Sequence, residues 1–490
     1  MWIADAARSR TIDQQAIHEF GVPSRDLMER AGQAVFEAAL PLAGGRRRIV
    51  VFSGPGNNGG DGFVVARLAH EHGLPAVCCA VSADRMSPQC REQRDRALAA
   101  GVQVVEDAQL LASLGPDDLV VDALLGTGAT GELRGPIADA IRAIAASAAP
   151  CVAVDIPSGI ACDTGRSLGP YVRAAKTVTF GLPKPFLFLA EGLEASGDWI
   201  VAEIGFPRAL LDVPTGVRLV GHPWVVSRLP RRTRNSHKGA NGSVLVVAGS
   251  ERMTGAALLA ATGALRAGAG LVTVAGGPEV CRAIQAQLPE AMVLPLTDAA
   301  DLLALQDRVD ALVLGPGLTP PVAGSLAARL VPDWAKPVVL DADALGPEVP
   351  AWPGPVVLTP HPGELGRMLG CSAGEVQADR WGCARRAAKR FGATVLLKGA
   401  ASVVASPSGW LWVNSTGNPG MAAGGMGDVL AGVVGTLLAQ GLSPEDAAAC
   451  GMFWHGAAGD ACAAEIGPAG FLASELASAL PRTRAERWSP

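Results

Sequence analysis

An aspartate at the end of a glycine-rich run is the residue of this chain best placed to do chemistry. Residues 418–428 read Asn-Pro-Gly-Met-Ala-Ala-Gly-Gly-Met-Gly-Asp, and an apolar run of helical pattern follows over residues 429–438. Glycines let a ligand approach the backbone, and the free N–H groups at the start of a helix attract an anion such as phosphate. Asp428 could therefore accept a proton from a hydroxyl that is about to meet a phosphoryl group. The alternative is a structural role as an acidic residue in the first helical turn.

Three loops in the first half carry a second group of candidate residues. Residues 53–62 (Ser-Gly-Pro-Gly-Asn-Asn-Gly-Gly-Asp-Gly), 122–132 (Asp-Ala-Leu-Leu-Gly-Thr-Gly-Ala-Thr-Gly-Glu) and 155–159 (Asp-Ile-Pro-Ser-Gly) each follow an apolar run. The first loop is neither a GxGxxG fingerprint nor a P-loop, because the terminal Lys-Ser/Thr is missing. Parallel strands would bring all three loops to one crevice. Alternatively, Asp122 and Asp155 cap their own loops, as aspartates in turns often do.

The elements that must position these loops follow from alternating apolar runs and helical patterns. Such alternation predicts an α/β fold with a Rossmann-like, doubly wound parallel sheet, which binds ligands beyond the carboxyl ends of its strands. The expected strands are residues 48–52, 76–81, 119–122, 151–155 and 177–180, and the expected helices are residues 63–72, 91–100 and 137–146.

Length favours two domains. A chain of 490 residues exceeds what one core usually holds. Four prolines interrupt regular structure in residues 207–230, and residues 228–234 are a short basic run. We expect one domain over residues 1–215 and a second over residues 222–490, with the basic run either a linker or a solvated loop of the second domain.

Composition limits the compartment and the partners. The net charge of −5 gives no basic footprint, and 1 Tyr and 11 Phe offer few stacking platforms, so we expect no nucleic-acid partner. The 10 cysteines contain no CxxC pair, and no charged-then-apolar leader opens the chain. No apolar stretch reaches the roughly 18 residues that span a bilayer. We expect reduced thiols, a cytoplasmic location and no membrane span, whereas the sequence leaves assembly into a homo-oligomer open.

The first half resembles NAD(P)H-hydrate epimerases. The three loops carry the resemblance together with Val-Pro-Ser at residues 22–24 and Leu-Met-Glu-Arg-Ala-Gly at residues 27–32. It implies that Asp155 lies at the reacting centre and that Asn58, Asp122 and Ser158 hold a potassium ion (K+). A hard, weakly charged cation prefers amide, hydroxyl and carboxylate oxygens and can offset phosphate charge. Asp155 is also an implied substrate contact, and the others are Asn57, Asn58, Gly59, Gly60, Asp61, Gly126, Thr127, Gly128, Ala129, Thr130, Gly131 and Glu132.

The second half resembles ribokinase-like α/β proteins and, among them, ADP-dependent NAD(P)H-hydrate dehydratases. Its Gly-Met-Gly-Asp segment resembles the ribokinase-fold anion hole, and further motifs occur in the order seen in the dehydratases. These motifs are residues 237–239, 249–250, 268–274, 315–317, 340–345, 359–364 and 396–399. The resemblance implies that Asp428 is the general base of a reaction that uses ADP with Mg2+. The implied substrate contacts are Ala256, Gly317, His361 and Asp428, and the implied nucleotide contacts are Lys398, Gly399, Ala400, Ala401, Ser402 and Gly427.

Four polar residues of the second half have alternative roles. His361, in a Thr-Pro-His-Pro turn, either faces a ligand or bonds nearby backbone. Asp341 and Asp343 close a buried-strand pattern whose period of two would put both on one face. There they either contact magnesium through water molecules or have a structural role at the end of the strand. Lys398 is either a point charge for phosphate or an ordinary lysine at a strand end.

The predicted function is repair of hydrated NADH and NADPH by a bifunctional enzyme, an isomerase joined to a lyase. The first domain would interconvert the R and S epimers. The second would use ADP to phosphorylate the hydroxyl of the S form, after which phosphate leaves and AMP and NAD(P)H remain. Preferences for ADP over ATP and for either hydrate stay open.

Two other functions compete with this prediction. A ribokinase-fold kinase of a small alcohol or vitamin would leave the first domain unexplained. An epimerase-like domain could instead serve as a binding scaffold, but the intact set of Asn58, Asp122, Asp155 and Ser158 argues against that role.

Overall fold

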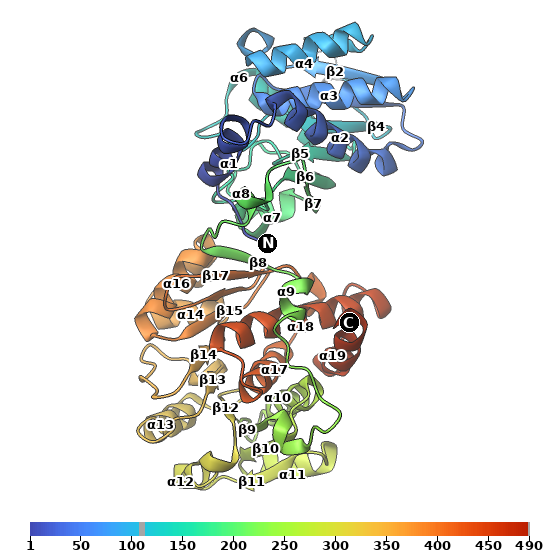
Figure 1. Ribbon diagram of the computed structural model, residues 1–490. Coiled ribbons are helices and arrows are strands. Elements are labelled where there is room, and N and C mark those ends of the chain that lie inside the picture. The colour runs from blue at the N-terminus through green and yellow to red at the C-terminus, as the bar shows by residue number, and fades with distance from the viewer. Residues whose placement is uncertain (107–112, 489–490) are drawn as a thin grey trace. The chain divides into compact units, whose positions relative to one another are not determined.

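The computed structural model describes residues 1–106 and 113–488. The chain forms two compact units, Met1–Thr215 and Gly216–Pro490, each with its own strands, helices and buried core (Figure 1).

The first unit is built on a seven-stranded parallel sheet of order β3-β2-β1-β4-β5-β6-β7. The order reverses between β1 and β4, which is where doubly wound sheets open a crevice. Its strands are β1 (Arg48–Ser53), β2 (Ala76–Ala80), β3 (Gln103–Val105), β4 (Asp118–Ala123), β5 (Cys151–Val154), β6 (Lys176–Phe180) and β7 (Asp198–Ala202). Its helices are α1 (Ala6–His18), α2 (Ser24–Ala43), α3 (Asn57–Glu71), η1 (Ala83–Arg85), α4 (Pro88–Ala99), α6 (Gly135–Ala146), η2 (Pro185–Phe188), α7 (Ala190–Ala195) and α8 (Arg208–Leu211).

The predicted α/β class is confirmed, and the five predicted strands are β1, β2, β4, β5 and β6. The predicted start of one helix is wrong, because α3 begins at Asn57 rather than at residue 63. Residues 57–62 of the glycine-rich segment therefore form the first turns of α3. The edge strands β3 and β7, whose residues are half-buried or exposed, were not predicted from the sequence.

The second unit carries a mixed ten-stranded sheet of order β11-β10-β9-β12-β13-β14-β15-β16-β17-β8. Its strands are β8 (Val217–Val220), β9 (Ser243–Val247), β10 (Leu271–Gly276), β11 (Met292–Pro295), β12 (Ala311–Leu314), β13 (Val338–Leu340), β14 (Val356–Leu358), β15 (Thr394–Leu397), β16 (Val403–Ala405) and β17 (Leu411–Asn414). Its helices are α9 (His222–Val226), η3 (Lys238–Asn241), α10 (Thr254–Ala267), α11 (Pro278–Gln287), α12 (Ala299–Leu303), η4 (Gln306–Arg308), α13 (Pro320–Leu330), η5 (Ala342–Ala344), α14 (Pro362–Leu369), α15 (Ala373–Ala378), α16 (Arg380–Phe391), η6 (Pro419–Met421), α17 (Met426–Ala439), α18 (Pro444–Glu465) and α19 (Ala473–Trp488).

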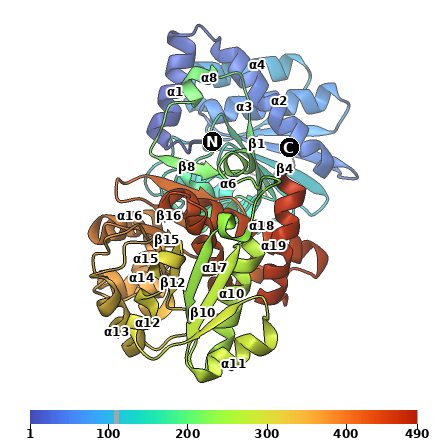
Figure 2. The same ribbon diagram turned by 60° about the horizontal axis from the view of Figure 1, so that its bottom comes forward.

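Helices α10 and α17 pack closely, and both views of the ribbon show them side by side (Figures 1 and 2). Gly263 and Gly432 lie at the contact, where an added Cβ would collide with the backbone of the facing helix. Most of α17 is buried, from Val429 to Leu438. This packing fixes the position of the helix start that carries Asp428.

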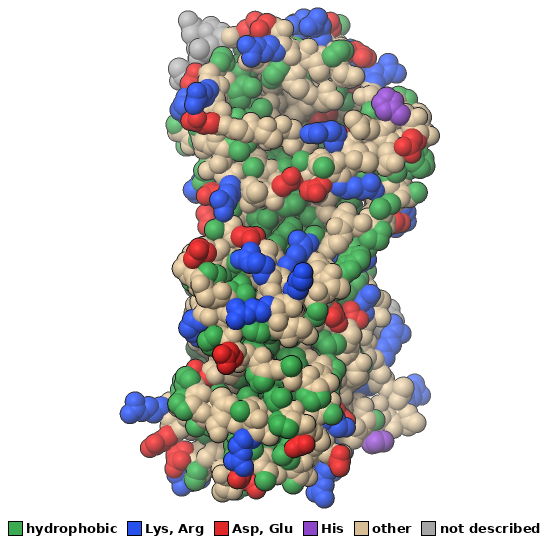
Figure 3. All heavy atoms as spheres, turned by 90° about the vertical axis from the view of Figure 1, so that its left-hand side faces the viewer, with side chains coloured by type: hydrophobic (Ala, Val, Ile, Leu, Met, Phe, Trp, Pro, Cys, Tyr) green, Lys and Arg blue, Asp and Glu red, His purple; other side chains and the backbone are tan. Residues whose placement is uncertain are grey.

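Charged side chains of both signs are interspersed on the molecular face in Figure 3. Among the described residues, none of the helices combines the length and the apolar character needed to cross a membrane.

Strand β8 belongs to the second unit although it precedes residue 222. It pairs in parallel with β17, and Leu219 and Val220 are buried. We therefore predict that a fragment of residues 216–490 is more stable than one of residues 222–490. Burial of two apolar side chains at about 1.5–3 kcal/mol each gives a difference of about 3–6 kcal/mol. Urea unfolding measures it, and equal free energies of unfolding would contradict a stabilising role for β8.

Candidate active sites

The first unit contains a cavity of about 540 Å³ at the carboxyl ends of β1, β4, β5 and β6. Helices α1 and α2 form part of its wall. Of the predicted residues, Asn57, Asn58, Asp61, Asp155 and residues 126–129 line it. The loops that follow three neighbouring strands thus meet at one site, as the sequence led us to expect.

Other predicted residues do not line this cavity. Gly59 and Gly60 are buried in packing contacts, where a Cβ would meet the Gly54 backbone and the Met28 side chain respectively. Thr130, Gly131 and Glu132 are exposed further along the loop, and Glu132 pairs with Arg134 at 2.5 Å.

Asp155 forms a buried ion pair with Lys184 at the floor of the cavity. Lys184 Nζ donates to Asp155 Oδ1 and to Thr179 Oγ1, each at 2.8 Å, and Thr179 Oγ1 donates to the same carboxyl oxygen at 3.0 Å. Asp155 adopts φ 65°, a left-handed conformation uncommon for any residue other than glycine. Such strain often marks a functional position.

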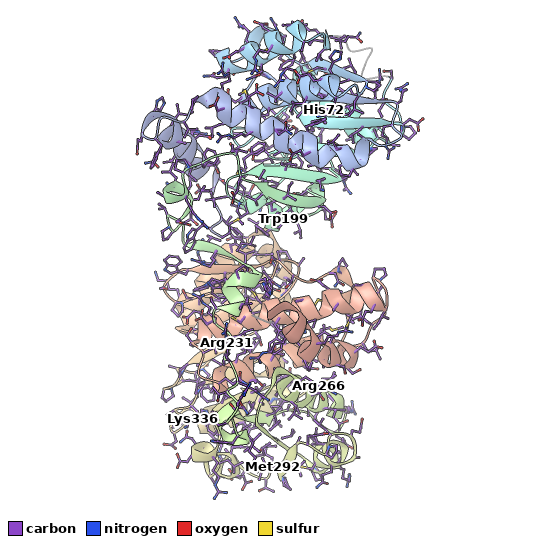
Figure 4. The ribbon with its side chains drawn as sticks, turned by 45° about the vertical axis from the view of Figure 1, so that its right-hand side comes forward. His72, Trp199, Arg231, Arg266, Met292 and Lys336 are labelled. Atoms are coloured by element: carbon purple, nitrogen blue, oxygen red, sulfur yellow. The ribbon has the colours of Figure 1, made fainter. Side chains whose placement is uncertain are left out.

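The segment after Lys184 anchors this lysine. All four residues of η2 are buried, and the Phe188 ring packs edge-on against the Trp199 ring, with the ring centroids 5.7 Å apart. Figure 4 labels Trp199, which belongs to β7. The sequence analysis did not include Lys184 among the site residues. Its sequence segment fits the epimerase pattern, but nothing local predicts its ion pair with Asp155, which lies 29 positions away.

Two further carboxyl groups line the cavity. Burial raises the pKa of Asp61 well above its ordinary value, and the charges of Asp155 and Asp13 add to this effect. Burial also raises the pKa of Asp13 to about 6, with Asp155 raising it further and Lys184 lowering it. Asp13 keeps exposed surface, but the cavity wall removes much of the water around its carboxyl. The sequence analysis missed Asp13, which lies in no recognisable motif.

Asn58, Asp122 and Ser158 form a connected polar cluster beside this cavity. Ser158 Oγ donates to Asp122 Oδ1 at 2.6 Å, and Asn58 Nδ2 donates to Leu125 O at 3.0 Å. Leu125 N in turn donates to Ser158 Oγ at 3.0 Å. One amide, one carboxyl and one hydroxyl suit a hard monovalent cation, and the described residues contain no group of three His, Cys, Asp or Glu that would favour a transition metal.

The second unit gathers its charged residues around Lys398, just after β15. Lys398 Nζ donates to Asp341 Oδ1 at 2.6 Å and lies 3.9 Å from Glu364 Oε2. Burial disfavours the charge of Lys398, but Asp341, Glu364 and Asp428 outweigh that effect and raise its pKa. The prediction that Asp341 and Asp343 share a strand face is wrong. The strand ends at Leu340, and Asp343 lies in the short helix η5.

Asp428 lies in the first turn of α17, close to this cluster. A Cβ at Gly427 would lie 3.3 Å from Lys398 Nζ and 4.0 Å from Asp341 Oδ2. The pKa of Asp428 is raised to about 7, mainly by burial and also by the Asp341 charge, while the Lys398 charge acts in the opposite direction. A carboxyl with this pKa can accept and release a proton near neutral pH.

The predicted substrate contacts of the second unit other than Asp428 lie on three different segments of the chain. Ala256 is in α10, and a Cβ at Gly317 would lie 2.5 Å from the Ala256 Cβ, so these two residues are neighbours. His361 caps the N-terminus of α14, and its Nδ1 accepts from Gly363 N and Glu364 N at 3.0 and 3.3 Å. The ring thus bonds nearby backbone, while about half of the side chain, 52%, stays exposed.

The predicted nucleotide contacts 399–402 form the turn between β15 and β16. Gly399 and Ala401 have φ of 129° and 46°, and Ser402 Oγ donates to Gly399 O at 2.8 Å. Arg380 stabilises the start of this turn, because its Nη2 donates a hydrogen bond to Lys398 O at 3.3 Å. Burial lowers the pKa of Arg380 to about 10.

His455 of α18 is a buried residue that the sequence analysis missed. Its pKa is lowered to about 4, mainly by burial and also by the Lys398 charge, against a hydrogen bond with the Met426 backbone that raises it. Its Nε2 has no hydrogen-bond partner within residues 1–106 and 113–488. His455 is therefore neutral beside the charged cluster, and nothing in its local sequence marks it.

The fold and the two sites define a two-domain α/β enzyme, with a Rossmann-like unit and a ribokinase-like unit. Residues 24–186 match the family model for the YjeF-related protein N-terminus, and residues 244–482 match the model for NAD(P)H-hydrate dehydratase. A solved Bacillus subtilis ADP/ATP-dependent NAD(P)H-hydrate dehydratase, co-crystallised with ATP and Mg2+, matches with TM-score 0.52 and 34% identity. The match covers 56% of this chain and 99% of that one. A ribokinase-like protein of Enterococcus faecalis matches with TM-score 0.50 and 25% identity, covering 57% of this chain and 99% of that chain.

Relatives match nearly the whole chain. The bifunctional NAD(P)H-hydrate repair enzyme of Moorella thermoacetica is 41% identical over 513 residues, covering 98% of this chain and 96% of that protein. The Escherichia coli enzyme of the same name is 38% identical over 488 residues, covering 98% and 93%. The chain belongs to the family of bifunctional NAD(P)H-hydrate repair enzymes, which confirms the resemblance seen in the sequence.

The raised pKa of Asp428 predicts that this residue lowers stability at alkaline pH. A carboxyl that titrates at about 7 in the folded state and near 3.8 when unfolded favours folding most at low pH, and this contribution is lost as pH rises through 7. We expect Asp428→Asn to be more stable than wild type at pH 8 by about 1–4 kcal/mol, since one pKa unit is about 1.4 kcal/mol. The difference should shrink below pH 4. Urea unfolding at both pH values measures it, and an unchanged difference would contradict the raised pKa.

Proposed function

We propose that this chain repairs hydrated NADH and NADPH with two active sites. The first unit interconverts the R and S epimers at the hydrated ring carbon, and the second converts the S form to NAD(P)H with ADP as phosphoryl donor. The observation that carries this proposal is the presence of two separately built sites on one chain, the Asp155–Lys184 cavity and the Asp428 helix start. Membership of the repair family supports it.

In the first unit, residues 1–215, the glycine-rich loops bind the dinucleotide. Asn57, Asn58 and residues 126–129, which line the cavity, would contact its phosphates through backbone N–H groups at and near the start of α3. Asn58, Asp122 and Ser158 would hold K+, which supplies positive charge beside those phosphates. Asp155 would face the reacting carbon, and Lys184 keeps its carboxylate oriented and its charge balanced.

In the second unit, Ala256, Gly317 and His361 would line the site for the hydrated nicotinamide. Residues 398–402 and Gly427 would contact ADP, whose Mg2+ supplies charge neutralisation at the phosphates. Asp428 accepts the hydroxyl proton as the oxygen attacks the β-phosphorus, and AMP leaves. The backbone N–H groups of residues 424–427 stabilise the charge of the transferring group. Phosphate then leaves the ring carbon, because phosphate is a better leaving group than hydroxide. The double bond returns when the ring loses a proton.

One assay tests the overall proposal against a plain kinase. Hydrated NADH is incubated with ADP, Mg2+ and K+ while dihydronicotinamide absorbance is followed. Absorbance should return and inorganic phosphate should appear in equal amount. A stable phosphorylated hydrate without return of absorbance would instead show a plain kinase that does not complete the dehydration. Replacing ADP by ATP in the same assay determines the donor.

Asp428→Asn should abolish dehydration and leave nucleotide binding intact. The amide keeps the size of the side chain but cannot accept the proton, so we expect a loss of at least about 100-fold in kcat. Absorbance recovery from the S epimer measures the rate, and calorimetry measures ADP binding. Turnover like that of wild type would remove Asp428 from the mechanism.

Asp155→Ala should impair the R epimer alone. With ADP present, the variant should repair the S epimer at the normal rate and the R epimer only as fast as it epimerises spontaneously. K+ should stimulate repair of the R epimer by wild type, because the proposed ion lies in the first unit. Normal repair of both epimers by the variant would assign Asp155 a structural role.

A further inference from the structure

Helix α1 presents one face, with two polar residues and one apolar residue, to the cavity of the first unit. Ser9, Asp13 and Ile17 are four residues apart and all line the cavity. On the adjacent face, Ile12 and Ala16 are buried in a cluster that also contains residues of α2 and of the segments after β6 and β7. The apolar face holds the helix in place, so Asp13 is directed to the cavity by packing.

The Asp13 carboxyl has no fixed partner in the part of the chain that the structure describes. Among the described residues it forms no hydrogen bond and no ion pair with another side chain. The charged groups that face it are Arg10 on its own helix, Asp61 of α3, and Asp155 with Lys184 at the sheet. Helix α2 contributes a serine and apolar side chains to the lining. Lys184 is already bound to Asp155, which leaves Asp13 available for a ligand.

Inversion at the hydrated carbon needs two proton-transfer groups if the hydroxyl is exchanged with water. The lone pair of the ring nitrogen expels the hydroxyl from one face, and an acid supplies the proton that makes it water. A water molecule then attacks the opposite face and gives a proton to a base. One C–O bond breaks and one forms, and the two groups together carry one proton before and after. A carboxyl held in one orientation, as Asp155 is by Lys184, can reach only one face of a bound ring, so this mechanism requires a second group.

We propose that Asp13 is the second catalytic acid–base residue of this epimerase site and serves the ring face that Asp155 does not reach. This inference rests on the proposed epimerase function. The two carboxyls approach the cavity from different elements, Asp13 from a helix of the wall and Asp155 from a strand end. Asp61 is a poorer candidate, because it is buried at 8% exposure within α3 and belongs to the loop proposed for the phosphates.

Asp13 also fits the proton requirement. Burial raises its pKa to about 6, and Asp155 and Lys184 shift it in opposite directions. Both directions of the reaction use the enzyme form with one proton shared between Asp13 and Asp155, so kcat/KM should fall as pH rises through about 6. Replacing Asp13 should abolish that dependence.

The test uses the full chain without nucleotide, so that the second unit is idle, and the purified R epimer as substrate. Chromatography separates the epimers, and the reaction is run in 18O-labelled water. We expect wild type to incorporate 18O at the rate of inversion. Asp13→Asn and Asp13→Ala should lose at least about 100-fold in kcat with little change in KM, and Asp13→Glu should recover part of the rate. Because alanine favours helix, a loss in both variants excludes simple melting of α1.

Gln14→Asn is the matched control, because Gln14 is exposed on the same helix and does not line the cavity. It should keep wild-type activity and the wild-type pH profile. Full activity of Asp13→Asn, or inversion by wild type with its original oxygen retained, would overturn the inference and leave the proposed function standing. Failure of wild type to accelerate inversion would overturn both.

Discussion

The structure depends on burying carboxylates beside a lysine whose positive charge balances their negative charge. Each site has such a pair: Asp155 with Lys184 in the first unit, and Asp341 with Lys398 in the second. Both lysines are largely enclosed by protein, and each follows a strand of a sheet whose carboxyl end faces the site. A buried charge without its partner is strongly destabilising, so the pairs restrict how strands, loops and helices can be arranged around them.

The balanced pair leaves other carboxyls in each site with raised pKa values. Asp13 and Asp61 surround the first pair, and Asp428 lies close to the second. In both units the lysine interacts most strongly with one carboxylate, and burial raises the pKa of its neighbours. Two neighbouring groups whose environments give them different pKa values can act as the acid and the base of one reaction. The same electrostatic arrangement has thus been built on two different sheets.

Close packing of small residues converts this electrostatic arrangement into a defined geometry. Gly263 and Gly432 let α10 and α17 meet at backbone distance, which fixes the start of α17. In the first unit, Gly59 brings α3 against the Gly54 backbone just after β1, and Gly54 in turn lies against the Leu124 backbone just after β4. At these positions a side chain would push a helix start away from the strand ends, and the anion-binding N–H groups would move with it.

The sequence alone determined the α/β class, the central strands of the first sheet and the segments that carry Asp155 and Asp428. Apolar runs of buried strands, glycine-rich loops and ordered motifs are local signals, and they can be recognised without knowledge of the fold. The ion pairs of Lys184 and Lys398, the cavity position of Asp13 and the burial of His455 were decided only by the tertiary structure. Each depends on contacts between residues far apart in the chain, or on water removed by several elements together. The expected strand position of Asp343 failed for a related reason, because its chain turns after Leu340 where periodicity predicted that it would continue.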